Sequence, residues 1–333
     1  MYQKIIIPFL IITLLLGMGF FYYIKKTDNF IKNTHVTLDV KIDKNEKFID
    51  TYNKIFKYLD TPPFFKYYVK HILQFSVNRK YGFYTADNLS IEDLLLNIST
   101  GKQKYFKILV VDGYNIYDIG SLLDKEGIIS YEDFIKTCLD KTFITKLTGH
   151  NLLSIEGFLY PDTYNFYREA SAENVIRVMY KNFLKHLPGD FIKTISNYGL
   201  DHYEGIILAS IVQKETFEDE EYKIIASVFY NRLKKHMRLQ ADPTVIYGIY
   251  SSFNGNLRKE DLENKANKYN TYKIKGLPPT PICNFSFKVL EGLMNPAKTN
   301  YLYFVANGKG GHIFSSTYKE HRNNIKKYHN TPR

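Results

Sequence analysis

The apolar segment near the N-terminus constrains this chain more than any other feature. Residues Ile5–Ile24 read IIIPFLIITLLLGMGFFYYI and carry no charge. About 20 such residues are enough for a helix that crosses the hydrocarbon core of a bilayer. A cleaved signal peptide has a shorter apolar run and a small-residue cleavage site, and this segment has neither. We therefore predict an uncleaved transmembrane anchor at residues 5–24.

The charges that flank the anchor leave its orientation open. Lys4 lies on one side, and Lys25, Lys26 and Lys32 lie on the other. Basic residues usually mark the cytoplasmic side of a membrane helix, but here they occur on both sides. Charge alone therefore does not decide which end of the anchor is cytoplasmic.

The charged residues of the chain argue against a nucleic-acid partner. Its 45 Lys and Arg exceed its 34 Asp and Glu, for a formal net charge of +11. The basic residues are scattered, and zinc-ligand spacing, a basic helix and an aromatic RNA-binding motif are missing from the sequence. We interpret the charge as a solvated surface. Cys138 and Cys283 are far apart in the sequence, so we predict two free thiols.

Short strand and helix patterns follow the anchor and predict an α+β fold. Residues 25–44 read as a polar linker that leads into a first strand, with alternating apolar residues from Val36 to Ile42. Residues 45–150 resemble a LysM-like α+β module, because short strands alternate with short helices. The predicted elements are aromatic-rich helices over 48–75 broken at Pro62 and Pro63, strands near 81–84 and 106–111, and helices over 90–97, over 115–123 and from 130.

Residues 151–333 form a second predicted α+β region. It opens with a structured loop over 155–167 and an amphipathic helix over 171–187. Near its end, a strand over 301–306 is followed by the hairpin turn Asn307-Gly308 and a return strand from His312. Thr317 and Glu320 have capping-box spacing, so we predict that they begin the last helix.

Glu215 is the candidate catalytic residue, at the end of a predicted helix over 203–216. Leu208, Ile211 and Glu215 are spaced by three and four residues, so the carboxylate continues an apolar helix face. Such a position removes water from a carboxyl group and raises its pKa, as a general acid near neutral pH requires. The alternative is a glutamate that points to solvent beyond the last apolar turn.

Other acidic residues near Glu215 have structural explanations. The run Glu218–Glu221 precedes the next helix, where the positive end of the helix dipole favours acidic side chains. Asp242 is predicted to be the N-cap of a helix that has Pro243 in its first position and ends at Gly248. The capping role explains the presence of Asp242, so no catalytic role is needed for this residue.

Motifs for metals, phosphates and activated nucleophiles are missing from the sequence. There is no H-E-x-x-H or comparable metal spacing, no Gly-rich phosphate loop and no G-x-S-x-G turn. His312 alone is typical of a structural or solvated histidine. We therefore expect no cofactor and no metal.

Eight longer motifs stand in a fixed order between roughly residues 150 and 325. They are EGFLYPDTY at Glu156–Tyr164, IVQKET at Ile211–Thr216, ASVFYNRL at Ala226–Leu233, MRLQADPTVIYG at Met237–Gly248, YNTY at Tyr269–Tyr272, GLPP at Gly276–Pro279, YLYFVA at Tyr301–Ala306 and GHIF at Gly311–Phe314. Together they resemble the endolytic murein transglycosylases, also described as the MltG or YceG-like family.

The resemblance implies a single-pass protein of the inner, or cytoplasmic, membrane, with residues 1–4 as a cytoplasmic tail. It implies that residues 151–333 are the catalytic domain, in the periplasm or otherwise outside the membrane. The implied reaction is a lyase cleavage of the MurNAc–GlcNAc bond inside nascent peptidoglycan strands, which leaves 1,6-anhydromuramyl ends and terminates elongation. The implied partners are glycan strands, membrane lipid around the anchor and peptidoglycan synthases.

The resemblance also assigns roles to single residues. It places the acid/base on Glu215, the second acidic position of the family's Glu-Lys-Glu-Thr motif. The chain has Gln213 at the first position, Thr280 where the family usually has Gly, and Phe285-Ser286 where it usually has Pro-Gly. Polar and aromatic residues of the motifs are expected to bind the glycan: Glu156, Asn231, Arg232, Gln240, Asp242, Thr244, Tyr247, Tyr269, Asn270, Tyr272 and His312.

Two other functions fit parts of the sequence. A non-catalytic peptidoglycan-binding or scaffolding protein would also need an anchor and a LysM-like module. A hydrolase on the same substrate would ordinarily need a second carboxylate as nucleophile or base, whereas the acids beside Glu215 have capping or dipole roles. The sequence therefore favours a lytic transglycosylase with one catalytic carboxylate.

Overall fold

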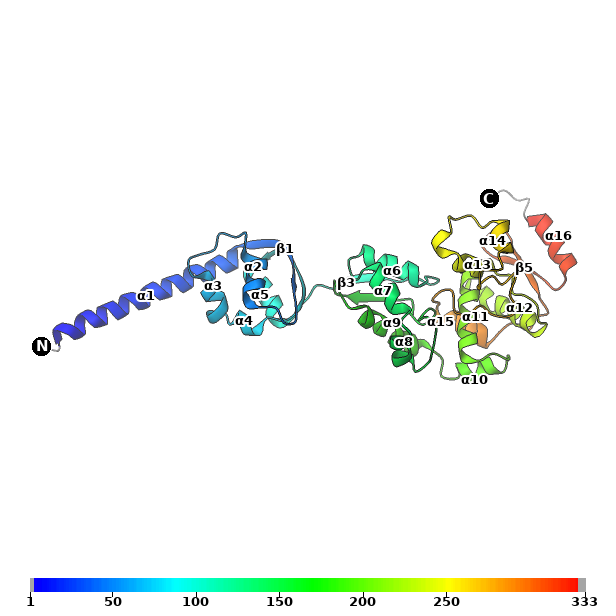
Figure 1. Cartoon of the computed structure of the whole chain (residues 1–333), viewed down its shortest axis with the longest axis horizontal. Coiled ribbons are helices and arrows are strands. Elements are labelled where there is room, and N and C mark those ends of the chain that lie inside the picture. The colour runs from blue at the N-terminus through cyan, green and yellow to red at the C-terminus, as the bar shows by residue number, and fades with distance from the viewer. Residues whose placement is uncertain (1–2, 329–333) are drawn as a thin grey trace. The chain divides into compact units, whose positions relative to one another are not determined.

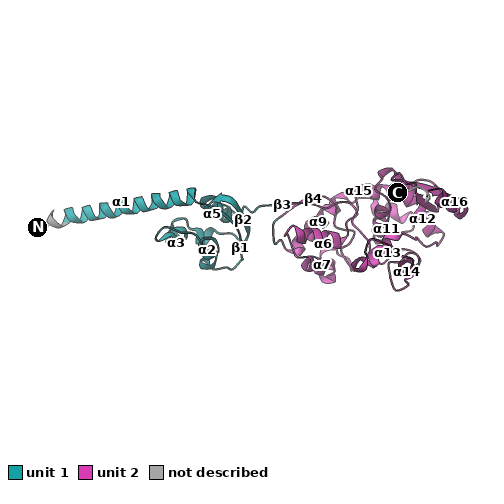
Figure 2. Cartoon of the chain, turned by 90° about the horizontal axis from the view of Figure 1, so that it is seen from above, with its two compact units in different colours: residues 1–106, 167–169 teal, residues 107–166, 170–333 magenta. Residues whose placement is uncertain are grey.

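The computed structural model describes residues 3–328 and divides the chain into two compact units, coloured separately in Figure 2. Unit 1 holds Met1–Phe106 with Tyr167–Glu169, and unit 2 holds Lys107–Phe166 with Ala170–Arg333. The predicted boundary between residues 150 and 151 falls inside unit 2. Helices mixed with short two-stranded sheets confirm the α+β class. Residues 1–2 of the predicted tail lie outside the described residues.

The N-terminal helix α1, Gln3–Asn33, contains the predicted anchor (Figure 1). It is long and apolar enough to cross a membrane, with a mean hydropathy of 2.1 in its apolar part. Most of its large apolar side chains from Ile6 to Tyr22 are exposed, as contact with lipid would require. Residues 25–33 are helical where the sequence predicted a linker, because Phe30 and Ile31 pack on the core of unit 1.

Unit 1 is built on an antiparallel pair of strands. Strand β1, His35–Ile42, pairs with β2, Gly82–Ser90, and the first strand is as predicted. Buried aromatic rings such as Phe65 and Tyr68 fill the space between the sheet and its helices. These helices are α2 (Phe48–Phe56), α3 (Phe65–Tyr67), the π-helix η1 (Tyr68–Ile72), α4 (Phe75–Asn78) and α5 (Ile91–Thr100).

The first half of unit 2 surrounds a second short sheet, in which β3, Phe106–Leu109, pairs with β4, Thr163–Phe166. The sequence predicted only a loop at β4, but Tyr164 and Phe166 alternate with exposed neighbours and are buried. The helix predicted from residue 130 is capped by Ser130, whose hydroxyl accepts a 3.2 Å hydrogen bond from the backbone N–H of Asp133. The helices are α6 (Ile116–Lys125), α7 (Tyr131–Cys138), α8 (Lys141–Thr148) and α9 (Ala172–His186).

The second half of unit 2 is arranged around α11, His202–Glu215, with buried residues from Gly205 to Gln213. In Figure 1, α10, α12, α13 and α15 lie around it, and each contacts it. The remaining elements are α10 (Phe191–Ser196), η2 (Asp219–Glu221), α12 (Tyr222–Lys234), α13 (Asp242–Gly248), η3 (Tyr250–Ser252), α14 (Lys259–Glu263), α15 (Phe287–Met294), β5 (Tyr303–Ala306), β6 (His312–Ser315) and α16 (Tyr318–Tyr328).

The C-terminal hairpin and helix follow the predicted order. Strands β5 and β6 pair antiparallel, from Tyr303 opposite Ser315 to Ala306 opposite His312. The capping box that begins α16 is confirmed: the Thr317 hydroxyl accepts from the Glu320 N–H, and the Glu320 carboxylate accepts from the Thr317 N–H. These local contacts fix where α16 starts, and so which of its residues can face α11.

Candidate active site

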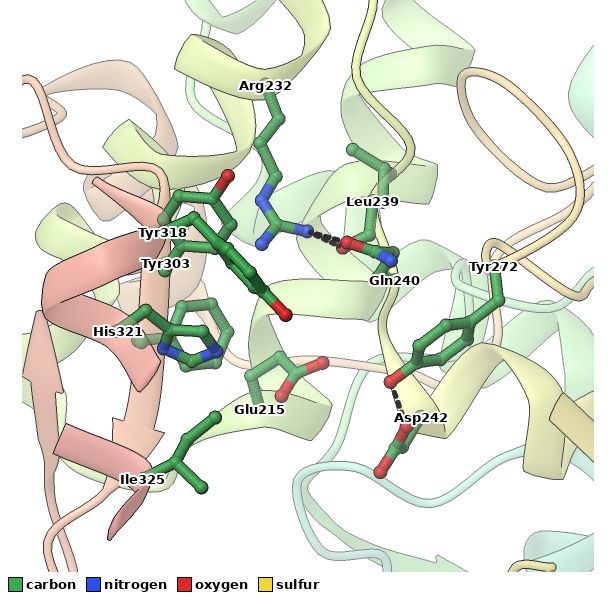
Figure 3. A pocket seen from close by; sticks show the side chains of 11 residues that line it. Glu215, Arg232, Leu239, Gln240, Asp242, Tyr272, Tyr303, Tyr318, His321 and Ile325 are labelled. Atoms are coloured by element: carbon green, nitrogen blue, oxygen red, sulfur yellow. Dashed lines mark hydrogen bonds between the residues drawn. The ribbon is translucent and has the colours of Figure 1, made fainter. Parts of the chain in front are cut away.

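A cavity of about 360 Å³, here called the Glu215 pocket, lies at the C-terminal end of α11 (Figure 3). Segments from the whole second half of unit 2 contribute to it. Its lining is Glu215 from α11, Arg232 from α12, Leu239, Gln240 and Asp242 from the turn into α13, Tyr272 from the loop beyond α14, Tyr303 and Phe304 from β5, and Tyr318, His321 and Ile325 from α16.

Helix α11 delivers the Glu215 carboxyl group into this pocket. The preceding residues Ile206–Val212 are buried on all sides, so packing fixes both the position and the rotation of the helix. Glu215 keeps partial exposure to solvent, but burial of its carboxyl raises its pKa to about 8. The charge of Asp242 raises this pKa as well, and the charge of Arg232 lowers it. The carboxyl is therefore protonated at neutral pH and able to donate a proton.

Asp242 corrects one of the predictions. The N-cap of α13 is Ala241, whose backbone is extended at φ −98° and ψ 113°, and Asp242 is already helical. The prediction of Asp242 as the cap was wrong by one residue. Its Oδ1 instead accepts a 2.6 Å hydrogen bond from the Tyr272 hydroxyl, and its side chain lines the Glu215 pocket. A second carboxylate therefore shares the pocket with Glu215.

Arg232, from α12, forms another wall of the pocket (Figure 3). Its Nε donates to the carbonyl of Leu302 at 2.6 Å, and one terminal nitrogen donates to the carbonyl of Leu239 at 2.6 Å. The same nitrogen lies 3.4 Å from Oε1 of Gln240. The guanidinium thus ties α12 to the turn before α13 and to the segment before β5, and it brings a positive charge near Glu215.

Helix α16 closes one side of the pocket with residues that the sequence did not single out. Tyr318, His321 and Ile325 are spaced by three and four residues and so share one face of the helix. This spacing on an otherwise polar helix is the sequence signal that could have identified the three residues. The His321 ring stacks on Tyr303 with centroids 5.1 Å apart. Burial, and then the charge of Arg232, lower the pKa of His321, and its Nδ1 has no hydrogen-bond partner within residues 3–328.

Glu156 and Tyr247, predicted to bind substrate, lie outside this lining and contact each other. Glu156 is fully buried, and its Oε2 accepts from the Tyr247 hydroxyl at 3.0 Å and from the backbone N–H of Ile116 at 2.9 Å. Its Oε1 accepts from the Asn284 amide at 3.0 Å. Burial raises the pKa of Glu156 to about 8, although the hydrogen bonds lower it. These contacts connect α6, α13 and the loop before α15.

Three further predicted residues lie outside the pocket lining and make hydrogen bonds within the segments 241–244 and 261–280. The Thr244 hydroxyl donates to the Ala241 carbonyl at 2.7 Å. The buried Asn270 amide donates to the carbonyls of Asp261, Leu262 and Asn264. The Tyr269 hydroxyl lies 2.8 Å from the hydroxyl of Thr280. Substrate contact by these residues and by Glu156 and Tyr247 stays a prediction.

The last two predicted residues lie near the Glu215 pocket but do not line it. His312 contacts Glu221, with its Nδ1 2.7 Å from a carboxylate oxygen, and this side chain is outside the pocket lining. Asn231 donates to the carbonyls of Thr299 and Tyr301 and lines a different cavity. The pocket therefore brings together Glu215, Arg232, Gln240, Asp242 and Tyr272 from the predicted set.

Gln213, two residues before Glu215, is buried and hydrogen-bonded at both ends of its amide. Its Nε2 donates to the Tyr222 hydroxyl at 3.1 Å, and its Oε1 accepts from the backbone N–H of Ser286 at 3.0 Å. Gln213 and Ser286, which are far apart in the sequence, are therefore in direct contact. Within residues 3–328, no cluster of three or more His, Cys, Asp or Glu side chains is placed to hold a metal ion.

Comparisons with known proteins cover most of the chain. Residues 40–327 match the model of the YceG-like family. A relative from Bacillus subtilis strain 168, named endolytic murein transglycosylase, is 30% identical over 334 residues, covering 95% of this chain and 91% of the relative. A relative with the same name from Streptococcus pneumoniae serotype 2 is 29% identical over 301 residues. This alignment covers 79% of this chain and 54% of the relative.

A solved structure has a similar fold. The crystal structure of a YceG-like protein from Listeria monocytogenes aligns with a TM-score of 0.59 and 30% sequence identity. The alignment covers 87% of this chain and 99% of the crystallised chain. The similarity therefore extends over both compact units and beyond the pocket alone.

Proposed function

The chain belongs to the YceG-like family, and on this premise we propose that it is a membrane-anchored endolytic lytic transglycosylase of peptidoglycan. Its relatives are named endolytic murein transglycosylases. The observation that carries the proposal is the Glu215 carboxyl, held in a pocket at the end of a buried helix with its pKa raised to about 8. Such a group is protonated before the reaction and can accept a proton after it has donated one.

The proposed mechanism uses Glu215 twice. The protonated carboxyl first donates its proton to the glycosidic oxygen, and the bond from the MurNAc anomeric carbon to that oxygen breaks. The resulting carboxylate then takes the proton of the C6 hydroxyl on the same MurNAc, while that oxygen bonds to the anomeric carbon. The products are a free GlcNAc hydroxyl and a 1,6-anhydromuramyl end, and no water is consumed. Glu215 ends the cycle protonated.

The other pocket residues supply binding and charge in this proposal. Arg232, Gln240 and Tyr272 offer polar groups to the sugar hydroxyls and acetamido groups, and Tyr303 and Tyr318 offer aromatic surface. Burial keeps Glu215 protonated, and the negative charge of Asp242 adds to this effect. In the second half of the cycle, the positive charge of Arg232 favours the Glu215 carboxylate.

A hydrolase is the second candidate, because Asp242 provides a second carboxylate in the same pocket. Hydrolysis of a glycosidic bond ordinarily uses two carboxyl groups, and the sequence alone had assigned Asp242 to a helix cap. We favour the lytic reaction because of the names of the relatives. The two reactions differ in their products: a hydrolase leaves reducing-end MurNAc, and a lytic transglycosylase leaves the anhydro form.

The proposal also covers the character of unit 1, the location of the protein in the cell and its partners. The sequence predicted a LysM-like module over residues 45–150; we propose that this module is instead unit 1, supported by its order of a strand, several short helices and an antiparallel second strand. We propose that α1 crosses the cytoplasmic membrane with unit 2 outside, in contact with nascent strands, and that peptidoglycan synthases are partners. The length and hydropathy of α1 support the membrane location.

Product analysis with a Glu215→Gln variant tests the function. The full chain, purified in detergent, is incubated with nascent glycan strands, and the products are identified by mass spectrometry. We expect anhydromuramyl ends from the native protein and a loss of roughly 10²–10⁴ in rate for the variant. Equal product release by the variant would remove Glu215 from the mechanism, no products at all would favour a scaffolding protein, and reducing ends would favour a hydrolase.

A further inference from the structure

A second cavity in unit 2 lies on a different face of α12 from the Glu215 pocket. It has a volume of about 660 Å³ and is formed by the loop between α10 and α11, by α12 and by the segment before β5. We call it the α12 groove and define it by Tyr198, Tyr230, Asn231, Lys234, Lys298 and Thr299. None of the roles proposed for the pocket uses these side chains.

The groove and the pocket share one wall. Consecutive residues of α12 face different cavities, because Asn231 lines the groove and Arg232 lines the pocket. The same holds for the segment that runs into β5, where Thr299 lines the groove and Tyr303 lines the pocket. Hydrogen bonds from Asn231 and Arg232 to carbonyls at 299–302 join these two parts of the wall. The two cavities are therefore neighbours.

Two stacked tyrosine rings give the groove an aromatic surface. The rings of Tyr198 and Tyr230 stack with their centroids 4.6 Å apart and their planes 19° apart. Tyr230 is buried, and its hydroxyl donates a 3.1 Å hydrogen bond to the Leu293 carbonyl. This bond fixes the position of the Tyr230 ring. Tyr198 remains 41% exposed. Aromatic faces are electron-rich, so the weakly positive C–H groups of a sugar ring pack well on such a surface.

The charges of the groove suit an anionic partner. The charged residues that line it, within the described part of the chain, are Lys234 and Lys298, and both are exposed. A peptidoglycan strand combines neutral sugar rings with peptides that carry carboxylates. An exposed aromatic ring beside two lysines matches both features of such a strand.

We propose that the α12 groove binds a further segment of the same peptidoglycan strand that is cut in the Glu215 pocket, with a sugar on Tyr198 and a peptide carboxylate at Lys234 and Lys298. The inference rests on the proposed function. An enzyme that cuts inside a strand has substrate on both sides of the broken bond, and a pocket of about 360 Å³ encloses only a short part of it. The adjacent groove extends the contact and favours long strands over short ones.

Strand binding in a Glu215→Gln background tests the groove without turnover. The probes are uncross-linked glycan strands with intact stem peptides and the same strands after amidase removal of the peptides, each titrated onto the full chain in detergent. Adding Tyr198→Ala is expected to weaken binding of both probes roughly two- to tenfold, whereas Tyr198→Phe keeps the ring and the affinity. Adding Lys234→Ala with Lys298→Ala is expected to weaken binding of the peptide-bearing strands only.

Matched controls separate the groove from general surface effects. Lys235→Ala removes the neighbouring exposed lysine, and Ile192→Ala removes an apolar side chain of α10 that is 58% exposed; both lie outside the groove lining. Neither is expected to change strand binding, and thermal unfolding of each variant reports on its folding. Unchanged affinity in folded Tyr198→Ala and double-lysine variants would overturn the groove proposal alone. The product analysis with Glu215→Gln decides the catalytic proposal separately.

Discussion

The hydroxyl of Tyr272 donates a 2.6 Å hydrogen bond to Oδ1 of Asp242 and holds that carboxylate in the wall of the pocket that contains Glu215. Burial raises the pKa of Glu215 to about 8, the Asp242 charge adds to the increase and the Arg232 charge opposes it. The protonation of Glu215 therefore depends on two neighbours of opposite charge. Replacing either neighbour is expected to shift the pH dependence of activity, in opposite directions.

Asp242→Asn is expected to move the alkaline limit of activity to lower pH. A general acid is active while protonated, so the rate falls as the pH rises through the pKa of Glu215, about 8 in the native protein. Without the Asp242 charge this pKa is lower, and the decline begins earlier. The measurement is the pH profile of the release of anhydromuramyl ends. Asp190→Asn, an exposed acid at the start of α10, is the matched control, and an unshifted Asp242→Asn profile would contradict the argument.

Arg232→Met is expected to move the same limit to higher pH. Removing the positive charge disfavours the Glu215 carboxylate and so raises its pKa further. The variant also loses the hydrogen bonds to Leu302 and Leu239, so we expect a loss of roughly 1–3 kcal/mol in the free energy of unfolding. Arg232→Lys keeps the charge and separates the two effects: it should lose stability with a smaller shift of the profile. A shift of Arg232→Met to lower pH would refute the assignment.

His321→Ala is expected to lower kcat/KM, on the order of tenfold, with little change in thermal stability. The ring of His321 lines the pocket and stacks on Tyr303, and α16 is otherwise mostly exposed. Its loss opens the pocket on that side and weakens the placement of the sugar. Arg322→Ala, at the next and exposed position of α16, is the control. Wild-type kinetics in His321→Ala would show that α16 does not contribute to substrate placement.

Glu156→Gln is expected to flatten the pH dependence of stability between about pH 4.5 and 8. The native state keeps the proton of Glu156 up to a pKa of about 8, whereas the unfolded chain loses it near 4.5. The folded state binds more protons in this window, so its stability falls as the pH rises, by up to roughly 1.4 kcal/mol per pH unit for this one group. Urea unfolding at several pH values measures the slope.

The control for Glu156→Gln is Glu260→Gln, which removes an exposed carboxylate of α14. The Glu260→Gln slope should equal that of the native protein. Glu215 contributes to the slope with the same sign, because its pKa is also raised, so the Glu156→Gln variant should retain part of the pH dependence. A slope identical to that of the native protein in Glu156→Gln would mean that Glu156 is ionised in the folded state at neutral pH.

The Glu156 contacts also show what the sequence could not give. Its partners Ile116, Tyr247 and Asn284 belong to three separate segments, and burial arises only when these segments pack together. A glutamate in a loop motif gives no sign of this from its neighbours in the chain. The contact between Gln213 and Ser286 is of the same kind, since neither residue identifies the other by spacing.

The sequence by itself determined the features that depend on residues a few positions apart. These are the apolar anchor in α1, the helix that ends at Glu215, the capping box of Thr317 and Glu320, and the β5–β6 hairpin. Only the tertiary structure decided that Asp242 faces Glu215 instead of capping α13, and that α16 supplies a wall of the pocket. Periodicity and capping are local hydrogen-bond and burial patterns, whereas the charges around Glu215 depend on the packing of segments that are distant in the chain.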